Sequence, residues 1–271
     1  MARKLFCQLG PAAYRMSALR CRTQRALRDV LSGTRFAREK APLLPIRTYT
    51  HASLIRRRLG SVDMRLQENK AVNLALTAPK VSGVLIHPGE TFSFWHLVGN
   101  CTEKNGYKEG LFISGGKVSS GIGGGMCQMT NLIHWMALHS DLTITEQHHH
   151  DQIDLFPDFG RQIPFGTGTS IAYNYLDYRL YNATSRTYQI CVWVDGEYLR
   201  GELRTDREPN TCYHVYTENE RFVREENGVY RCGTVYRRRV DRKTGNILMA
   251  EVLRENHARV MYDPNSIKAG V

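Results

Sequence analysis

Apolar residues in the first 80 positions of the chain recur with a helical period. Residues 17–28 alternate arginine with alanine and leucine, which predicts a helix that ends before Pro42, because proline cannot continue a helix interior. A second helical pattern covers residues 61–78 and is expected to end at Pro79. Its apolar positions are Met64, Leu66, Val72, Leu74 and Leu76. We therefore expect two helices ahead of any sheet.

The pattern changes to strands after Val81. Residues 84–86 and 91–95 are rich in β-branched and aromatic side chains, and a His-Pro-Gly turn separates them. Further strands are predicted at 142–145, 170–175, 178–181, 187–194 and 197–203. Three dipeptides signal turns, and the first of them signals a hairpin between two strands: Asp195-Gly196, Asn227-Gly228 and Thr244-Gly245.

A glycine-rich stretch between these strand patterns opens one further helix. Residues 119–125 contain four glycines, and residues 126–139 then contain neither glycine nor proline. Apolar residues recur at helical spacing in the second range, at Met126, Met129, Ile133 and Met136. The chain is therefore expected to be an α+β protein, with a mainly antiparallel sheet, one central helix after the glycine-rich loop, and a basic helical N-terminal segment.

Charge divides the chain unevenly. The net charge is +11, and residues 1–60 hold fourteen Lys and Arg against Asp29 and Glu39. The remaining 23 basic and 24 acidic residues nearly balance. We therefore expect three parts: a basic, largely helical segment at 1–60, the main domain at 61–210, and a β-rich extension at 211–271 that packs on it.

The basic segment suggests a partner of opposite charge. We expect residues 1–60 to associate weakly with an anionic membrane and to contribute little to the fold of the rest. No base-reading motif accompanies the charge, so no nucleic acid is expected. The alternative is that this helix packs on the body and its charge keeps the protein in solution. The apolar side chains available for shallow insertion are Leu5, Phe6, Tyr14, Leu19, Leu27, Val30 and Leu31.

Two absences point to a protein of the cytoplasm, peripheral at most on the inner face of the membrane. No apolar run approaches the ~20 residues that span a bilayer, and the N-terminus lacks the apolar segment of a signal peptide. The seven cysteines are odd in number, scattered and never in C-x-x-C spacing. Such usage indicates a reducing compartment with one or two meaningful thiols.

The glycine-rich loop places Cys127 where a helix begins. The positive field of a helix N-terminus lowers a thiol pKa, so Cys127 is a candidate nucleophile with a histidine as its base. The neighbouring Gln128 is a candidate donor to an oxyanion. The alternative is a structural cysteine that fits where glycine packing leaves little room. Nucleotide binding is excluded, because the loop lacks the Lys-Ser/Thr of a P-loop and the last glycine of G-x-G-x-x-G.

The histidine triplet at 148–150 raises the question of a metal. Alternate residues of a strand share a face, so His148 and His150 would point the same way and, with Cys127, would make three ligands. Histidines in a surface loop are the interpretation that we favour, so neither a metal nor another cofactor is expected.

Three long motifs resemble the VanW family. They are Pro88-Gly-Glu-Thr-Phe-Ser-Phe-Trp95, Gly106-Tyr-Lys-Glu-Gly110 and Ser120-Gly-Ile-Gly-Gly-Gly-Met-Cys-Gln-Met129, with a later one at Tyr175–Thr184. The resemblance covers roughly residues 60–205. The family is associated with glycopeptide-resistance gene clusters and with cell-envelope proteins, so the resemblance implies a role in the cell envelope.

The resemblance also implies a set of site residues. Gly123, Gly124, Gly125, Cys127 and Gln128 match the family's Gly-Gly-Gly-x-Cys-Gln signature. The histidine after the helix corresponds to His150, whereas His148 matches a variable position. Asp177 matches the aspartate of the next motif, but Gly168 stands where many members have a further aspartate.

These residues suggest a thiol site that acts on peptidoglycan precursors. We expect Cys127 and His150 to converge with one acid or amide, either Asp177 or Asn174, which strand alternation would place on opposite faces. The implied activity is that of a thiol hydrolase or acyltransferase on a cell-wall precursor or peptide-like ligand. The competing hypothesis is a non-catalytic module that binds such a precursor or a partner.

Overall fold

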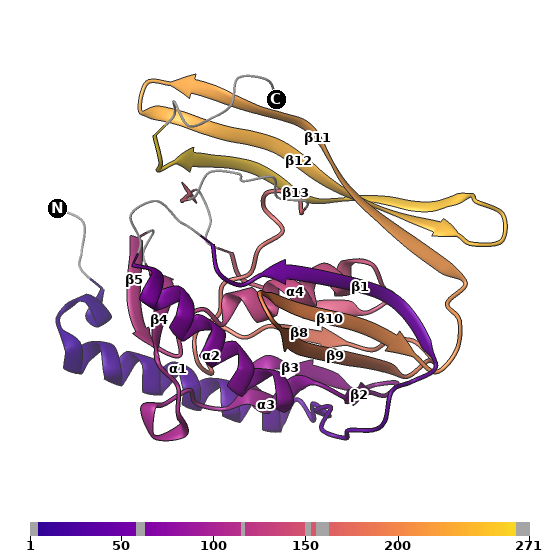
Figure 1. The fold of residues 1–271 in the computed structure, drawn as a ribbon, viewed down its shortest axis with the longest axis horizontal. Coiled ribbons are helices and arrows are strands. Elements are labelled where there is room, and N and C mark those ends of the chain that lie inside the picture. Colours follow the sequence, from indigo (N-terminus) through magenta and orange to yellow (C-terminus); the bar gives the residue numbers. More distant parts are fainter. Residues whose placement is uncertain (1–4, 58–62, 115–116, 150–152, 156–162, 264–271) are drawn as a thin grey trace.

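A computed structural model describes residues 5–57, 63–114, 117–149, 153–155 and 163–263, and its elements are shown in Figure 1. The helices are η1 (Phe6–Gln8), α1 (Pro11–Leu31), α2 (Met64–Val81), α3 (Phe94–Val98), η2 (Glu103–Asn105) and α4 (Cys127–Leu138). The strands are β1 (Ile46–Leu54), β2 (Val84–Ile86), β3 (Thr91–Ser93), β4 (Glu109–Ser114), β5 (Lys117–Ile122), β6 (Thr143–Glu146), β7 (Ile153–Asp154), β8 (Arg179–Tyr181), β9 (Tyr188–Asp195), β10 (Tyr198–Thr205), β11 (Thr211–Glu225), β12 (Gly228–Asp241) and β13 (Ile247–Val260).

The core lies between α4 and an antiparallel sheet of order β1-β10-β9-β2. Residues 129–130 and 132–138 of α4 are all buried. Gly201 of β10 lets this helix approach the sheet closely, since a Cβ there would lie 2.9 Å from Leu132 and 2.8 Å from Met136 side-chain atoms. This close packing makes α4 the central helix that the sequence predicted.

Two smaller β units complete the body. One is a three-stranded sheet of order β3-β8-β6, and the other is the hairpin β4–β5, whose second strand runs into the glycine-rich loop before α4. Helix α2 begins at Asp63, whose side chain accepts a hydrogen bond from the Arg65 amide at 2.8 Å. The architecture is α+β with mainly antiparallel pairing, as predicted.

Several local predictions are confirmed. The helix expected at 126–139 is α4, and Gly196, with φ +57°, lies in the tight turn between β9 and β10. The Asn227-Gly228 turn joins β11 to β12, and the Thr244-Gly245 turn joins β12 to β13.

Three local predictions are wrong. Pro79 does not end α2, which continues to Val81, because a proline in the last turn removes a single amide from the helix. The strand expected at 91–95 stops at Ser93, whose hydroxyl accepts from the His96 amide at 3.2 Å and begins α3. The strand expected at 170–175 is a turn bridged between Ala172 and Leu176.

The described part of the N-terminal segment, residues 5–57, belongs to the fold through strand β1, contrary to the expectation that residues 1–60 contribute little to it. Strand β1 is hydrogen-bonded to β10 along its whole length, from Ile46 opposite Thr205 to Leu54 opposite Tyr198. A domain boundary near residue 60 would therefore assign β1 to a different domain from the sheet in which it is paired. Helix α1 lies along the outer side of the body (Figure 1).

The C-terminal strands form a layer of their own (Figure 1). They make a long antiparallel meander, β11-β12-β13, and β13 also pairs in parallel with the short β7. Side chains connect this layer to the body. The Tyr213 hydroxyl donates to Asp141 at 2.7 Å, and the Asn256 amide donates to the Phe165 carbonyl at 2.9 Å.

Within the described ranges, no helix combines the length and apolar character needed to cross a bilayer.

Candidate functional site

The three glycines before α4 are required by close packing. A Cβ on Gly123, with φ +75°, would overlap the Cys101 side chain, and one on Gly124 would overlap the main chain of Gly110. A Cβ on Gly125, with φ +93°, would overlap the stem of Lys70. The signature glycines therefore bring β4, α2 and the loop into direct contact.

The loop's own polar groups are largely used within the fold. The Gly123 amide donates to the Lys108 carbonyl at 3.0 Å, and the Gly124 amide donates to the Gly121 carbonyl at 3.1 Å. Asn73 of α2 donates to the Gly124 carbonyl at 3.0 Å and accepts from the Lys108 amide at 2.8 Å. The loop is thus a rigid platform for the start of α4.

Cys127 is the first residue of α4, as predicted. Burial raises the pKa of the Cys127 thiol and outweighs the main-chain amides of Ile171 and Cys127, which lower it. Burial of the sulfur therefore acts against the lowered pKa that the helix start predicts. The cysteine is intermediate in exposure.

Gln128 points toward β1. Its Nε2 donates to Ser53 Oγ at 2.9 Å and to the Leu54 carbonyl at 2.9 Å. These bonds connect the end of β1 to the first turn of α4, and they occupy the amide that was the candidate oxyanion donor.

A polar face of α4 continues from Cys127. Asn131 and His134 follow at spacings of four and seven residues, so the three share one side of the helix. The Asn131 Oδ1 accepts from the Thr169 amide at 2.6 Å and from the Thr169 hydroxyl at 2.8 Å. Gln147 donates to His134 Nε2 at 3.0 Å, which leaves the proton of the ring on Nδ1.

His134 is a neutral, internal histidine. Its Nδ1 lies 3.0 Å from the Tyr178 hydroxyl, and burial lowers the pKa of His134 to about 3. The imidazole is therefore uncharged at physiological pH and fixes the tyrosine instead of serving as a base.

Residues 168–171 lie along this polar face. Gly168 accepts from Gln147 at 3.2 Å, and the Ser170 amide donates to the His148 carbonyl at 2.6 Å. Cys127, Asn131, Gln147 and Ser170 are all partly exposed. These groups leave a strip of polar side chains at the surface between α4 and the 168–171 segment.

Asp177 is fully buried and holds neighbouring backbone. Its carboxylate accepts from the Ser93 hydroxyl at 2.5 Å, the Trp95 amide at 3.0 Å and Arg179 Nε at 2.9 Å. Its contacts thus secure the β3–α3 junction, and the described contacts of Cys127 do not include it.

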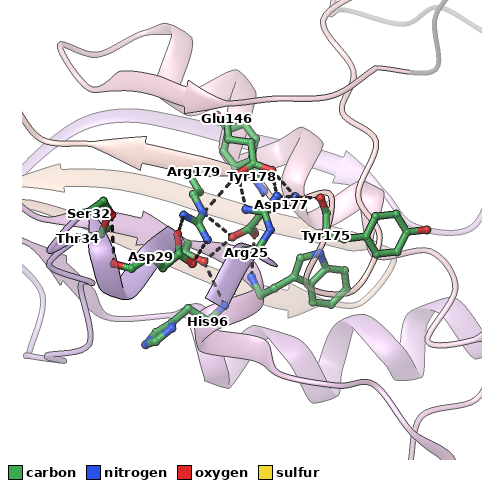
Figure 2. A network of polar contacts seen from close by, with 12 residues as sticks. Arg25, Asp29, Ser32, Thr34, His96, Glu146, Tyr175, Asp177, Tyr178 and Arg179 are labelled. Atoms are coloured by element: carbon green, nitrogen blue, oxygen red, sulfur yellow. Dashed lines mark hydrogen bonds and ion pairs between the residues drawn. The ribbon is translucent and has the colours of Figure 1, made fainter. Parts of the chain in front are cut away.

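Glu146 connects two of the predicted site residues. Figure 2 shows it with Asp177 and Arg179, facing Arg25 and Asp29 of α1. Glu146 Oε1 accepts from His148 Nε2 at 2.9 Å and from the Asp177 amide at 2.8 Å. Although burial would raise the pKa of Glu146, hydrogen bonds from Arg25 and His148 hold it at about 2. His148 and Asp177 therefore meet through a carboxylate that sequence reasoning overlooked.

Asn174 occupies the turn that replaces the expected strand. Its φ of +53° is left-handed, a conformation that asparagine tolerates better than most residues. The argument that strand alternation would separate Asn174 from Asp177 is therefore wrong. The flanking Tyr173 and Tyr175 carbonyls accept hydrogen bonds from arginines of α1, at 3.2 Å and 2.8 Å.

Lys70 of α2 is the functional candidate that the sequence analysis missed. Its stem packs against Gly125, its exposed fraction is 8%, and it has no hydrogen bond or ion pair with any described residue. Burial and the nearby charges of Arg57 and Arg56 lower the pKa of Lys70 to about 7. One signal was available: Lys70 lies at helical spacing from Gln67, Asn73 and Thr77, which are all buried polar residues.

A hollow of about 540 Å³ lies beside the same loop. It is lined by Asn69, Glu103, Tyr107, Lys108, Glu109, Gly121 and Ile122. Because Asn69 of α2 and Gly121 of the loop both line it, the hollow borders α2 and the glycine-rich loop.

The remaining predictions concern His150 and a metal. His150 lies outside the described residues, so its pairing with Cys127 or with His148 stays a prediction. Among the described residues, no three His, Cys, Asp or Glu side chains are grouped in a way that could hold a metal ion.

Comparison with known proteins shows the family. A family model described as VanW like protein matches residues 69–204. The vancomycin B-type resistance protein VanW of Enterococcus faecalis (strain ATCC 700802 / V583) is 38% identical over 206 residues, which are 76% of this chain and 74% of the relative. The uncharacterized protein YoaR of Bacillus subtilis (strain 168) is 28% identical over 115 residues, 42% of this chain and 36% of the relative. No solved structure matches. The matched region runs from α2 to β10 and contains the glycine-rich loop, Cys127 and Asp177, and the chain belongs to the VanW family.

Proposed function

We propose that this chain binds a peptidoglycan-type cell-wall precursor where the glycine-rich loop meets α4. The observation that carries the proposal is Lys70, a buried ammonium group without a partner among the described residues, placed beside Gly125 two positions before Cys127. The 38% identity to a vancomycin B-type resistance protein supports this ligand class, which the family's association with the cell envelope also suggests.

The chemistry of the surface suits an anionic, peptide-like ligand. A buried cation without a counter-ion is costly, and a carboxylate of the precursor would offset that cost. The N-terminus of α4 adds a positive field on the same side as the loop. Asn131 Nδ2 and Gln147 Oε1, the amide atoms not used in the contacts with Thr169, His134 and Gly168, can serve peptide hydrogen bonds along the polar strip.

The geometry supports binding better than thiol catalysis. A thiol nucleophile needs a lowered pKa or an adjacent base. Burial raises the pKa of Cys127. We infer that Cys127 contributes packing at the edge of the ligand site.

Isothermal titration calorimetry with a soluble muramyl-pentapeptide precursor tests the proposal. We expect the wild-type chain to bind and Lys70→Met to bind at least tenfold more weakly, because a charge-assisted hydrogen bond is lost. Lys104→Met is the matched control, since Lys104 is an exposed lysine outside this cluster. A wild-type chain that does not bind, or a folded Lys70→Met variant of equal affinity, would contradict the proposal.

Thiol labelling separates the binding protein from the enzyme. We expect iodoacetamide at pH 7 to modify Cys127 more slowly than a model thiol, with the rate read by mass spectrometry of the peptide that contains it. Modification faster than the model thiol would favour a thiol hydrolase or acyltransferase instead.

A further inference from the structure

Helix α1 docks on the body through its polar side. Arg25 makes two hydrogen bonds of 2.6 Å to Glu146, and Asp29 accepts two from Arg179 at 2.6 and 2.7 Å. Arg22 lies over the Tyr173 ring with its guanidinium carbon 4.8 Å from the ring centroid. These three residues share one side of α1 at helical spacing, and this side is fixed against the turn at 173–175 and strands β6 and β8. Figure 2 shows Arg25 and Asp29 of this side with Glu146 and Arg179.

The opposite side of α1 is apolar and faces outward. Met16, Leu19, Leu27 and Val30 recur at helical spacing, and their exposed fractions are 62%, 64%, 57% and 79%. None of the residues of α1 is buried. Leu5, Phe6 and Leu9, just before the helix, are also exposed. A helix on a globular protein normally buries its apolar side and exposes its polar side. In α1 the polar side contacts the body and the apolar side is exposed.

The charges that remain on α1 are positive. Its one acidic residue, Asp29, is neutralised by Arg179. Arg15, Arg20 and Arg28 have no ion pair with any described residue. The exposed part of the helix therefore combines an apolar side with uncompensated arginines.

We propose that the outward side of α1, formed by Met16, Leu19, Leu27 and Val30 with Arg20 at its edge, lies on an anionic lipid surface. A helix that presents apolar side chains beside basic ones rests in the plane of the membrane interface, with the apolar groups at the acyl boundary and the arginines among the headgroups. The docking bonds fix its orientation, so the whole body is held at the surface rather than at the end of a tether.

The charge pattern favours lipid over a second copy of this chain. A symmetric dimer through this side would bring the same unpaired arginines of two helices together, and like charges repel. An anionic headgroup layer instead offers a counter-charge to Arg20 at the edge of the apolar side. Protein–protein interfaces also deplete charge at their centre, whereas Arg20 lies between Met16 and Leu27 in the sequence of the helix.

Co-sedimentation of the full chain with vesicles tests this proposal. We expect binding to vesicles of phosphatidylcholine with 30% phosphatidylglycerol at low salt, and a loss of at least tenfold in the partition coefficient at 0.5 M NaCl or with pure phosphatidylcholine. Leu19→Gln with Leu27→Gln should reduce binding at least tenfold. Leu43→Gln with Leu248→Gln, two equally exposed apolar positions outside α1, is the matched control and should bind like wild type.

Two results would overturn the proposal. One is equal vesicle binding by the α1 variant and the control, with circular dichroism showing both folded. The other is a vesicle-independent dimer of the wild-type chain, measured by light scattering, that the α1 variant loses, since this would assign the surface to a second copy.

Discussion

Charged side chains are withdrawn from water in two regions of the molecule, the docking side of α1 and the loop before α4. At α1 they are paired, Arg25 with Glu146 and Asp29 with Arg179. Before α4 the ammonium of Lys70 packs against a glycine and has no counter-ion among the described residues. Paired charges attach one element to another, whereas an unpaired buried charge destabilises the fold. A residue retained at such a cost is typical of a binding site.

Removing the unpaired charge of Lys70 should have the largest effect on stability. We expect Lys70→Met to raise the free energy of unfolding at pH 7 by as much as about 5 kcal/mol, since the lysine pKa falls from 10.5 to about 7 on folding. The unfolded chain binds more protons between pH 7 and 10.5, so the wild type gains stability over that range as pH rises.

Urea denaturation at pH 6, 7 and 10.5 checks this prediction. The difference between Lys70→Met and wild type should be largest at the two lower values and should nearly vanish at pH 10.5. A variant less stable than wild type at pH 6, with Lys104→Met unchanged, would show that Lys70 is compensated in the fold.

Removing one partner of the ion pairs that hold α1 should instead lower the free energy of unfolding. Arg179→Met leaves the buried Asp177 without its ionic partner and removes both hydrogen bonds to Asp29. We expect a loss of about 3–5 kcal/mol, the usual cost of removing one partner of a buried pair. Thermal and urea unfolding measure it, with the exposed Arg200→Met as a control. A loss below about 1 kcal/mol would mean that the network adds little to stability.

A smaller effect on stability is expected at Glu146, which belongs to the same network of ion pairs. Glu146 has its pKa lowered to about 2 from a usual 4.5, so its contribution to stability is complete above pH 4.5 and is lost as pH falls toward 2. Glu146→Gln should cost about 2 kcal/mol at pH 7, because it weakens the charge-assisted bonds from Arg25. Hydrogen exchange should show faster exchange across α1 in this variant, and unchanged exchange in α1 would contradict its docking through Glu146.

Helices and turns that depend on a short stretch of sequence could be predicted from the sequence alone. The 3.6-residue period identified α4, and the dipeptides at 195, 227 and 244 identified three turns. The pairing of Arg25 with Glu146 joins residues 121 positions apart, so no local period reveals it. The strand expected at 170–175 failed because Asn174 adopts a left-handed conformation that overrides the β propensity of its neighbours.

The sequence identified several residues of the candidate site, but it did not predict their pKa values or their neighbours in space. The glycine signature and Cys127 were found from their pattern, and they do form one loop and helix start. The thiol pKa depends on how much protein surrounds the sulfur, and Lys70 depends on which side of α2 faces the loop. Both are properties of packing between elements distant in the chain.

The pairing of β1 with β10 also determines when the central sheet can form during synthesis of the chain. Residues 46–54 leave the ribosome long before residues 198–205, yet β10 is the neighbour of β1 in the sheet. An antiparallel pair separated by so much chain closes slowly, because loop-closure entropy must be overcome before the contacts form. The growing chain therefore carries β1 without its partner while residues 55–197 are synthesised, and the sheet around α4 closes only after the hairpin of β9 and β10 is complete.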